Sequence, residues 1–183
     1  MNNDKVSVII PSYNRFHYLL NTIESIKNQT YKNIEIYIHH DGPVNDKSIK
    51  EKYYIENIPI QNKGVVCRFD FNVPIKNEII TDDFRIISAI PTIKTILQAN
   101  PKYIILTSHF GRPNKFDLTY SLKKILPILE QQLQTHIEFL DKGLTEETIY
   151  KINLNKHKIY LLENLRFYKE ETEYELISDI NNN

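Results

Sequence analysis

The chain has 183 residues, 41% of them apolar and 25% charged, so it can bury a hydrophobic core of ordinary size. Lys plus Arg and Asp plus Glu both number 23, and this balance argues against nucleic acid or an anionic membrane as a partner. No cleavable leader opens the sequence, and no apolar run approaches the roughly 18 residues that a membrane span needs. We therefore expect a cytoplasmic protein.

The first predicted elements form a strand, a helix and a second strand. "VSVII" (6–10) is a buried run that Pro11 is expected to stop, apolar residues over 19–26 recur at helical spacing, and "IEIYI" (34–38) alternates like a strand. Two strands joined through a helix are almost always parallel, with a right-handed crossover. Ser12 and Asp41 are therefore expected to follow strand ends at the same edge of a sheet.

The stretch from "VSVIIPSYN" to "IEIYIHHDGP" resembles the opening of the family-2 glycosyltransferases over about residues 5–46. In that family the two strand ends hold the nucleoside of a sugar donor. The resemblance implies nucleotide-sugar binding by Pro11, Ser12, Tyr13 and Asp41.

This first unit departs from the glycosyltransferase pattern in its acidic residues. His40 stands where the family usually has the first Asp of its second strand end, and the downstream Asp-x-Asp metal ligands have no counterpart after residue 50. The neighbouring His39 and His40 point to opposite faces of a strand, so they do not readily share one ion. We expect no metal site and no sugar transfer.

A second α/β pattern begins after a charged joint near residues 47–54. Strands are predicted at "VVCRFDF", "YIILTS", "IEFL" and "KIYLL", and helices at 86–97, 122–133 and 145–152. Pro91 and Pro127 fall inside helical stretches and are expected to kink them or to delay their start. Cys67 lies in the first of these strands, where a buried structural thiol is the default role.

Polar residues cluster after the carboxyl ends of these strands. They are Asp70 and Asn72, then Ser108, His109 and Arg112, then Asn164 and Arg166, with Arg85 at the start of the first helix. In a parallel sheet such positions gather at the ligand-binding edge. Three guanidiniums beside one carboxylate predict a site for a ligand with more than one negative group.

Asp70 has two alternative roles at this edge. A carboxylate among arginines can orient them or accept hydrogen bonds from ligand hydroxyls, which a ligand made only of phosphate does not require. Alternatively, Asp70 and Asn72 are turn residues before Pro74, and the arginines are merely solvated.

Four motifs of this unit resemble the N-terminal domain of phosphoglycerate kinases, in order, over about residues 53–173: "FDFNVP", "TSHFGRPN", "YSLKKILPILEQQL" and "IYLLENLRF". The resemblance implies binding of 3-phosphoglycerate by Asp70, Asn72, Arg85, His109, Arg112 and Arg166. It also implies that Arg85 is catalytic, stabilising the phosphoryl group during transfer, as a positive clamp does.

The family's ATP- and magnesium-binding domain has no counterpart in these 183 residues. We therefore expect two partial parallel-sheet units of an α/β protein: residues 1–50, glycosyltransferase-like, and residues 51–183, a truncated kinase-like domain. The chain alone is expected to bind no cofactor, to lack catalysis, and to associate through an uncovered sheet edge. Two alternatives remain, namely a nucleotide-sugar-binding protein derived from a glycosyltransferase and a non-catalytic chimera.

Overall fold

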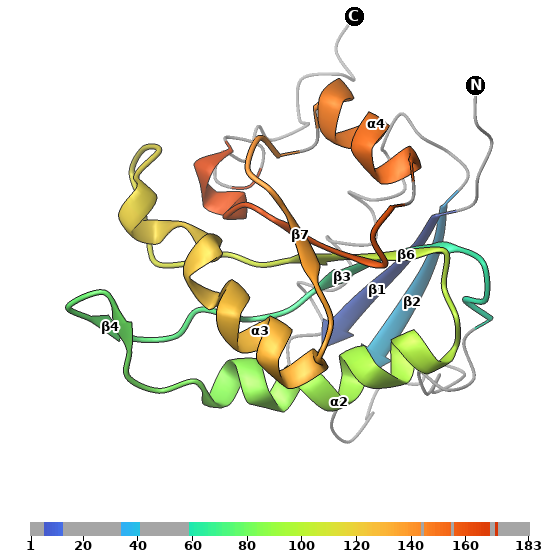
Figure 1. The fold of residues 1–183 in the computed structure, drawn as a ribbon, viewed down its shortest axis with the longest axis horizontal. Coiled ribbons are helices and arrows are strands. Elements are labelled where there is room, and N and C mark those ends of the chain that lie inside the picture. Colours follow the sequence, from blue (N-terminus) through green and yellow to red (C-terminus); the bar gives the residue numbers. More distant parts are fainter. Residues whose placement is uncertain are drawn as a thin grey trace, which may run out of the picture.

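The computed structural model describes residues 6–12, 34–40, 59–143, 145–154, 156–168 and 171. These residues form an α/β fold around one six-stranded parallel sheet with the strand order β2-β1-β3-β6-β8-β7 (Figure 1). The strands are β1 (Val6–Ser12), β2 (Ile34–His40), β3 (Gly64–Arg68), β6 (Tyr103–Thr107), β7 (Ile137–Leu140) and β8 (Ile159–Leu162). The predicted strands and their parallel pairing are confirmed.

Strands from both predicted units belong to this one sheet. β1 pairs with β2 on one side and with β3 on the other, where Val6 lies opposite Gly64 and Ile9 opposite Cys67. The sequence pattern assigns these strands to two units, and the pairing of β1 with β3 joins them in one sheet. The helix predicted over 19–26 and the joint near 47–54 lie outside the described residues, so the division at residue 50 stays a prediction.

Strand β1 runs through Pro11 to Ser12 instead of stopping at Pro11. Its pairing with β3 ends at Ile9 and Cys67, whereas its pairing with β2 continues to Ser12 and His40. Pro11 therefore has a neighbouring strand on one side only. A locally one-sided position tolerates a residue without an N–H group, so the proline does not end the strand.

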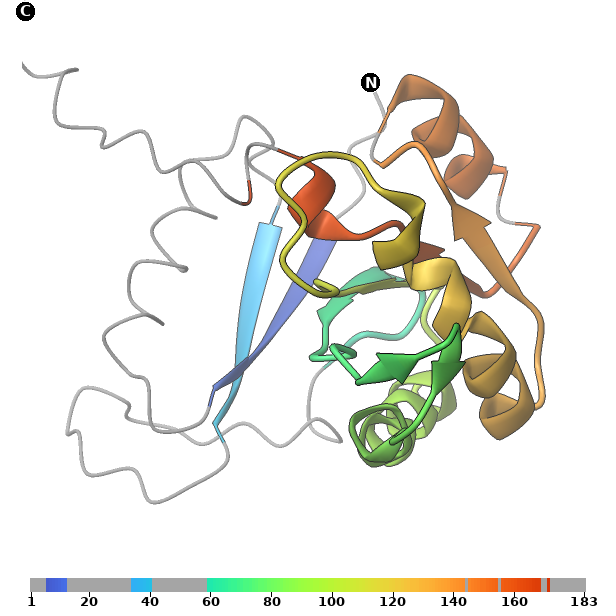
Figure 2. The same cartoon turned by 90° about the vertical axis from the view of Figure 1, so that its left-hand side faces the viewer.

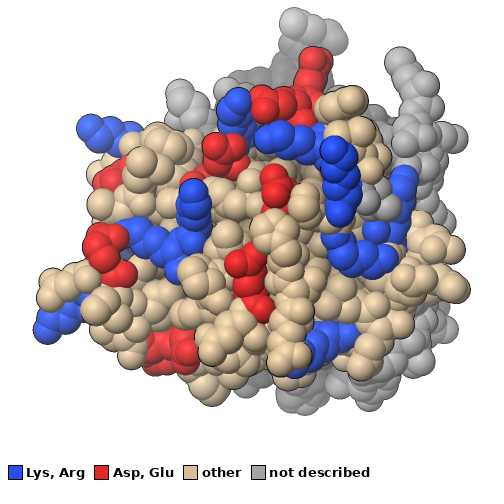
Figure 3. Space-filling view, in the orientation of Figure 1, with Lys and Arg blue, Asp and Glu red and all other residues tan. Residues whose placement is uncertain are grey.

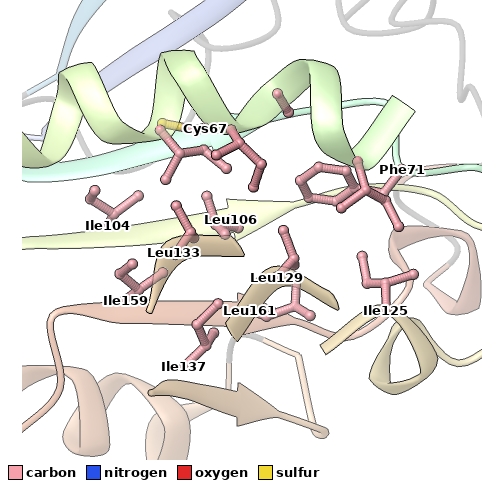
Figure 4. Close-up of a cluster of buried hydrophobic side chains, with 14 of the residues drawn as sticks. Cys67, Phe71, Ile104, Leu106, Ile125, Leu129, Leu133, Ile137, Ile159 and Leu161 are labelled. Atoms are coloured by element: carbon pink, nitrogen blue, oxygen red, sulfur yellow. The ribbon is translucent and has the colours of Figure 1, made fainter. Parts of the chain in front are cut away.

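Helices cover both faces of the sheet. On one face α2 (Phe84–Gln98) and α3 (Leu126–Leu133) pack on side chains of β3, β6, β7 and β8, as Figure 4 shows. On the other face Ile152 of α4 (Glu146–Asn153) packs with Ile105, Tyr160 and Leu162. Successive strand residues thus serve two cores, as the alternation of side chains requires.

The predicted buried thiol is confirmed in the larger core. The Cys67 side chain is 2% exposed, and burial raises the pKa of its thiol to about 12. A thiol that stays protonated is a poor nucleophile and a poor metal ligand.

The two prolines behave differently. Pro91 lies inside α2, which is continuous from Phe84 to Gln98. Pro127 lies in the first turn of α3, and residues 122–125 before it form a 3₁₀ helix, so this helix starts later than its apolar pattern indicates. No described helix combines the length and the apolar character that crossing a membrane would take.

A hairpin that the sequence analysis missed projects beyond the carboxyl end of β3 (Figure 1), and its two short strands are drawn in green in Figure 2. It pairs β4 (Ile75–Lys76) with β5 (Ile79–Ile80), and both turn residues, Asn77 and Glu78, have positive φ. Such two-residue turns usually carry Gly at the second position. Glu78 occupies that position here, so the sequence lacks the glycine that usually indicates such a turn.

A buried polar network follows β8 and fixes the loops at the carboxyl ends of the strands (the carboxyl edge). Glu163, 2% exposed, accepts hydrogen bonds from the Ser121 hydroxyl at 2.7 Å and from the Leu122 N–H at 2.9 Å. The Asn164 side chain accepts from the Phe110 N–H at 3.0 Å and donates to the carbonyls of Phe110 and Tyr120 at 2.7 and 2.9 Å. Residues far apart in the sequence are thereby held together.

We expect Leu129→Ala to lower the free energy of unfolding by about 2–5 kcal/mol, because it removes a fully buried side chain of α3 and leaves a cavity against the sheet. The matched control is Leu118→Ala, at a side chain that is 66% exposed, which should change stability by less than about 0.5 kcal/mol. Urea unfolding followed by circular dichroism measures both. Equal losses would contradict the packing described above.

We expect Asn164→Leu to cost at least about 3 kcal/mol of unfolding free energy, because several buried N–H and carbonyl groups lose their partner at once. Asn114→Leu makes the same chemical change at an exposed position and should be near neutral. The same urea titration compares the two variants. A cost below about 1 kcal/mol for Asn164→Leu would mean that water replaces the amide.

Candidate functional site

The predicted site residues follow the carboxyl ends of three neighbouring strands, β3, β6 and β8. The register places Arg68 beside Thr107 and Leu106 beside Leu161, so the three strands end at one edge. The Ser108 hydroxyl accepts a hydrogen bond from the Phe71 N–H at 2.9 Å, and the Ser108 carbonyl accepts one from the Leu165 N–H at 3.1 Å. Ser108 therefore ties together the segments that carry the polar side chains.

Asp70 lies between a guanidinium and an imidazole. Its Oδ2 is 2.5 Å from Nη1 of Arg85, which lies in the first turn of α2, and its Oδ1 is 3.9 Å from Nε2 of His109. Oδ1 also accepts a hydrogen bond from the Asn72 N–H at 3.1 Å. The Asp70 and Arg85 side chains remain 54% and 51% exposed, so a ligand can reach both partners of this pair.

Gly111 connects two more of the predicted residues. Its N–H donates to Oδ1 of Asn72 at 2.8 Å, and its carbonyl accepts from the guanidinium of Arg166. Gly111 has φ +61, and a Cβ there would lie 2.2 Å from Cδ1 of Tyr120. Only glycine fits this turn without strain, because a side chain would meet both the unfavourable φ and the aromatic ring.

The site is electropositive around His109. Burial lowers the pKa of His109, the positive charge of Arg166 lowers it further, and Asp70 partly opposes both effects. Arg68 is a further positive neighbour, although Glu171 lies 2.5 and 2.9 Å from its two terminal nitrogens. A lowered pKa favours the neutral form of this imidazole at neutral pH.

Arg112 is exposed directly after the Gly111 turn, and within the described part of the chain no hydrogen bond or ion pair to its side chain is found. Close by, a surface pocket of about 320 Å³ extends from the Gly111 turn toward the β4–β5 hairpin. Its lining includes Asn72, Ile75, Glu78, Gly111, Tyr120 and Lys124. The face shown in Figure 3 mixes both signs of charge.

The structure thus brings five of the predicted residues into one connected group, Asp70, Asn72, Arg85, His109 and Arg166, with Arg112 beside it. The sequence analysis did not single out Gly111 or the Arg68–Glu171 pair. The backbones of Pro11 and Ser12 lie opposite His39 and His40 at the end of β1, at this same end of the sheet. Tyr13 and Asp41 lie outside the described residues.

Two family models match the chain. The model described as "Phosphoglycerate kinase" matches residues 55–182, and the one described as "Glycosyl transferase family 2" matches residues 7–65. Among curated proteins, the phosphoglycerate kinase of Wolbachia pipientis subsp. Culex pipiens is 46% identical over 118 residues, 64% of this chain and 30% of the relative. That of Kluyveromyces lactis is 40% identical over 126 residues, 68% of this chain and 30% of the relative.

Solved structures of phosphoglycerate kinases are also similar to this chain. The phosphoglycerate kinase of Pyrococcus horikoshii OT3 matches with a TM-score of 0.57 and 30% identity, over 64% of this chain and 29% of that one. The phosphoglycerate kinase of Coxiella burnetii matches with a TM-score of 0.51 and 31% identity, over 62% and 28%. The chain therefore spans about 30% of the length of the curated relatives it matches. Because the first family model covers more than half of its residues, the chain belongs to the phosphoglycerate kinase family.

Proposed function

We propose that this chain binds 3-phosphoglycerate at the carboxyl edge of its sheet, as the acid-binding part of a phosphotransferase. The observation that carries the proposal is the position of Asp70, held between Arg85 and His109 beside further guanidiniums. The proposed ligand-binding residues are Asp70, Asn72, Arg85, His109, Arg112 and Arg166.

The chemistry of the ligand matches these side chains. A guanidinium makes paired, charge-assisted hydrogen bonds to phosphate or carboxylate, and 3-phosphoglycerate carries one group of each kind. Arg112 has no competing partner among the described residues, so it can bind an anion without breaking an existing pair. Asp70 and Asn72 offer oxygen acceptors, and the carboxylate suits the hydroxyl of the glycerate.

Arg85 has a second role in this proposal. It is half-exposed, and Asp70 is its one carboxylate partner among the described residues, so a phosphoryl group can attract its guanidinium away from that pair. A positive group aimed at the oxygens of a transferring phosphoryl group stabilises the charge that develops there. We assign Arg85 this catalytic role in the kinase reaction.

Magnesium and ATP, which the family resemblance implies, do not fit the described residues of this edge. Asp70 faces Arg85, and Glu171 faces Arg68, so both carboxylates already neutralise a guanidinium. We therefore propose that these residues bind and orient the phosphorylated acid only. Phosphoryl transfer itself remains a property proposed from the relatives, of which this chain spans about 30%.

A second candidate function is binding of a nucleotide-sugar near the ends of β1 and β2. The family-2 glycosyl transferase match over residues 7–65 favours it, as do two parallel strands that end together. The residues proposed for it are Pro11, Ser12, Tyr13 and Asp41. Titration with a uridine diphosphate sugar distinguishes this function, because Asp41→Ala should weaken that binding and Arg166→Ala should not.

Titration calorimetry with 3-phosphoglycerate tests the first proposal. We expect one weak site per chain. Its affinity should fall as salt is added, because dissolved ions screen the charges of a site that is open to solvent. Arg112→Ala and Arg166→Ala should each weaken binding about tenfold or more, since one lost charge-assisted contact costs roughly 1.5–3 kcal/mol.

The matched control for these variants is Lys94→Ala, which removes one exposed positive charge from the middle of α2. It should leave the affinity for 3-phosphoglycerate within about twofold of the parent, because a solvent-exposed charge beyond a Debye length of about 10 Å is screened. If Lys94→Ala weakens binding as much as Arg166→Ala does, only the net charge matters and there is no defined site. If the parent binds no better than the Arg112→Ala/Arg166→Ala double variant, the proposed function is wrong.

We also expect ligand binding to take up a proton at His109. Without ligand, burial and Arg166 lower the pKa of His109, so the imidazole is neutral at neutral pH. A bound anion favours the charged imidazolium and raises that pKa, so affinity should increase as pH falls through the pKa of the complex and level off once the free imidazole is protonated as well. Calorimetry in two buffers with different ionisation enthalpies measures the uptake.

The control for proton uptake is His109→Gln, which keeps a hydrogen-bonding side chain but cannot titrate. The phosphate of the ligand titrates near pH 6 in the experiments with the parent and with the variant alike. The difference in proton uptake between the two proteins therefore isolates His109. Equal proton uptake by the two proteins would show that His109 does not contact the bound anion.

A further inference from the structure

We propose that the chain carries a second ligand site, a zinc site formed by His136, Glu138 and His157 at the opposite end of the sheet. His136 immediately precedes β7, Glu138 lies within β7, and His157 lies just before β8. One potential ligand atom from each of the three side chains lies within 4.8 Å of the other two. The site is independent of the proposed acid-binding residues, which follow the carboxyl ends of the strands.

The distances fit a small cation. Oε2 of Glu138 is 3.7 Å from Nε2 of His136 and also 3.7 Å from Nε2 of His157. The ligand atoms of the two imidazoles lie within 4.8 Å of each other. Zinc bonds of about 2.0–2.2 Å in a tetrahedron place ligand atoms about 3.3–3.6 Å apart. Side-chain movements on the order of 1 Å therefore complete a three-ligand set, and water would occupy the fourth position.

A carboxylate on α3 orients one of the two imidazoles. Oε1 of Glu130 lies 2.8 Å from Nδ1 of His136 and accepts a hydrogen bond from the Ile137 N–H at 2.9 Å. A proton on Nδ1 shared with Glu130 leaves the lone pair on Nε2, the atom that faces Glu138. Metal-binding histidines almost always have a carboxylate or carbonyl on the other ring nitrogen for this purpose.

The second imidazole is positioned by aromatic rings. The ring of His157 lies edge-on to buried Tyr160, with centroids 6.1 Å apart, and to His136, with centroids 5.1 Å apart. The Tyr160 ring is fully buried and bounds one side of His157. His136 is thus oriented by a carboxylate and His157 has a buried neighbour on one side before any ion binds, which lowers the entropy cost of binding.

The donor set selects the class of metal. Two imidazoles and one carboxylate suit zinc and its neighbours among the transition metals, whereas magnesium and calcium prefer all-oxygen sites. The side chains of His157 and Glu138 are about one-third exposed, at 34% and 31%, and that of His136 is 63% exposed, so an ion can enter from solvent. A bound ion would tie the starts of β7 and β8 together.

Titration of the whole chain with Zn²⁺, followed by calorimetry, tests the site. We expect one ion to bind per chain, with His136→Ala or His157→Ala weakening the affinity at least tenfold. Glu130→Gln should weaken it about 10- to 100-fold, because the variant loses the carboxylate that orients His136 without losing a ligand. In NMR spectra the imidazole signals of His136 and His157 should shift on addition of Zn²⁺, and an equal concentration of Mg²⁺ should shift neither.

Two control variants remove other histidines. His109→Ala takes one imidazole from the acid-binding edge, and His39→Ala/His40→Ala takes the adjacent pair from β2. Both should bind Zn²⁺ as the parent does. The proposal is overturned if the parent shows no saturable binding below about 1 mM Zn²⁺. It is also overturned if binding survives in His136→Ala and is lost in His39→Ala/His40→Ala. Unchanged circular dichroism of each variant excludes unfolding as the cause of any loss.

Discussion

The fully buried amide of Asn164 is the interaction on which the carboxyl edge of the sheet depends. Its oxygen accepts a hydrogen bond from the Phe110 N–H, and its nitrogen donates to the carbonyls of Phe110 and Tyr120. A buried polar group of this kind stabilises only the arrangement that satisfies all its hydrogen bonds. The turn at Gly111, which contacts Asn72 and Arg166, is therefore fixed by a residue that is itself out of reach of any ligand.

The charged side chains next to this buried hydrogen-bond network are largely exposed. Asp70 and Arg85 form a close ion pair that is open to water, and an exposed pair of this kind contributes little to stability. In the proposed site, this pair places opposite charges where the hydroxyl and anionic groups of a ligand would replace water. The fold thus separates two tasks: buried amides and hydroxyls set the loop geometry, while exposed charges remain available for binding.

The sequence predicted the parts of the fold that depend on periodicity, because apolar runs and helical spacing record which faces are buried. It also placed Asp70 and Arg166 at one edge, since parallel strands leave few alternatives. It missed the hairpin, where Glu78 occupies a left-handed position that glycine usually fills. It also expected β1 to stop at Pro11, because the one-sided pairing there depends on where β3 ends, a tertiary fact. The pairing of Asp70 with Arg85 depends on side-chain rotamers that no spacing rule reveals.

The positions of the histidines show the same limit of prediction from the sequence. His109 follows a strand in a motif that can be recognised, whereas His136 and His157 stand 21 positions apart with no shared pattern. They come together because β7 and β8 are adjacent and Ile137 lies opposite Ile159, so residues just ahead of both strands become neighbours. A parallel sheet creates such neighbours at both of its ends, yet loops at the carboxyl ends have more freedom to carry side chains toward a ligand. At the amino ends of β7 and β8 the register itself places the residues just ahead of the two strands side by side, which suits the small ion that we propose there.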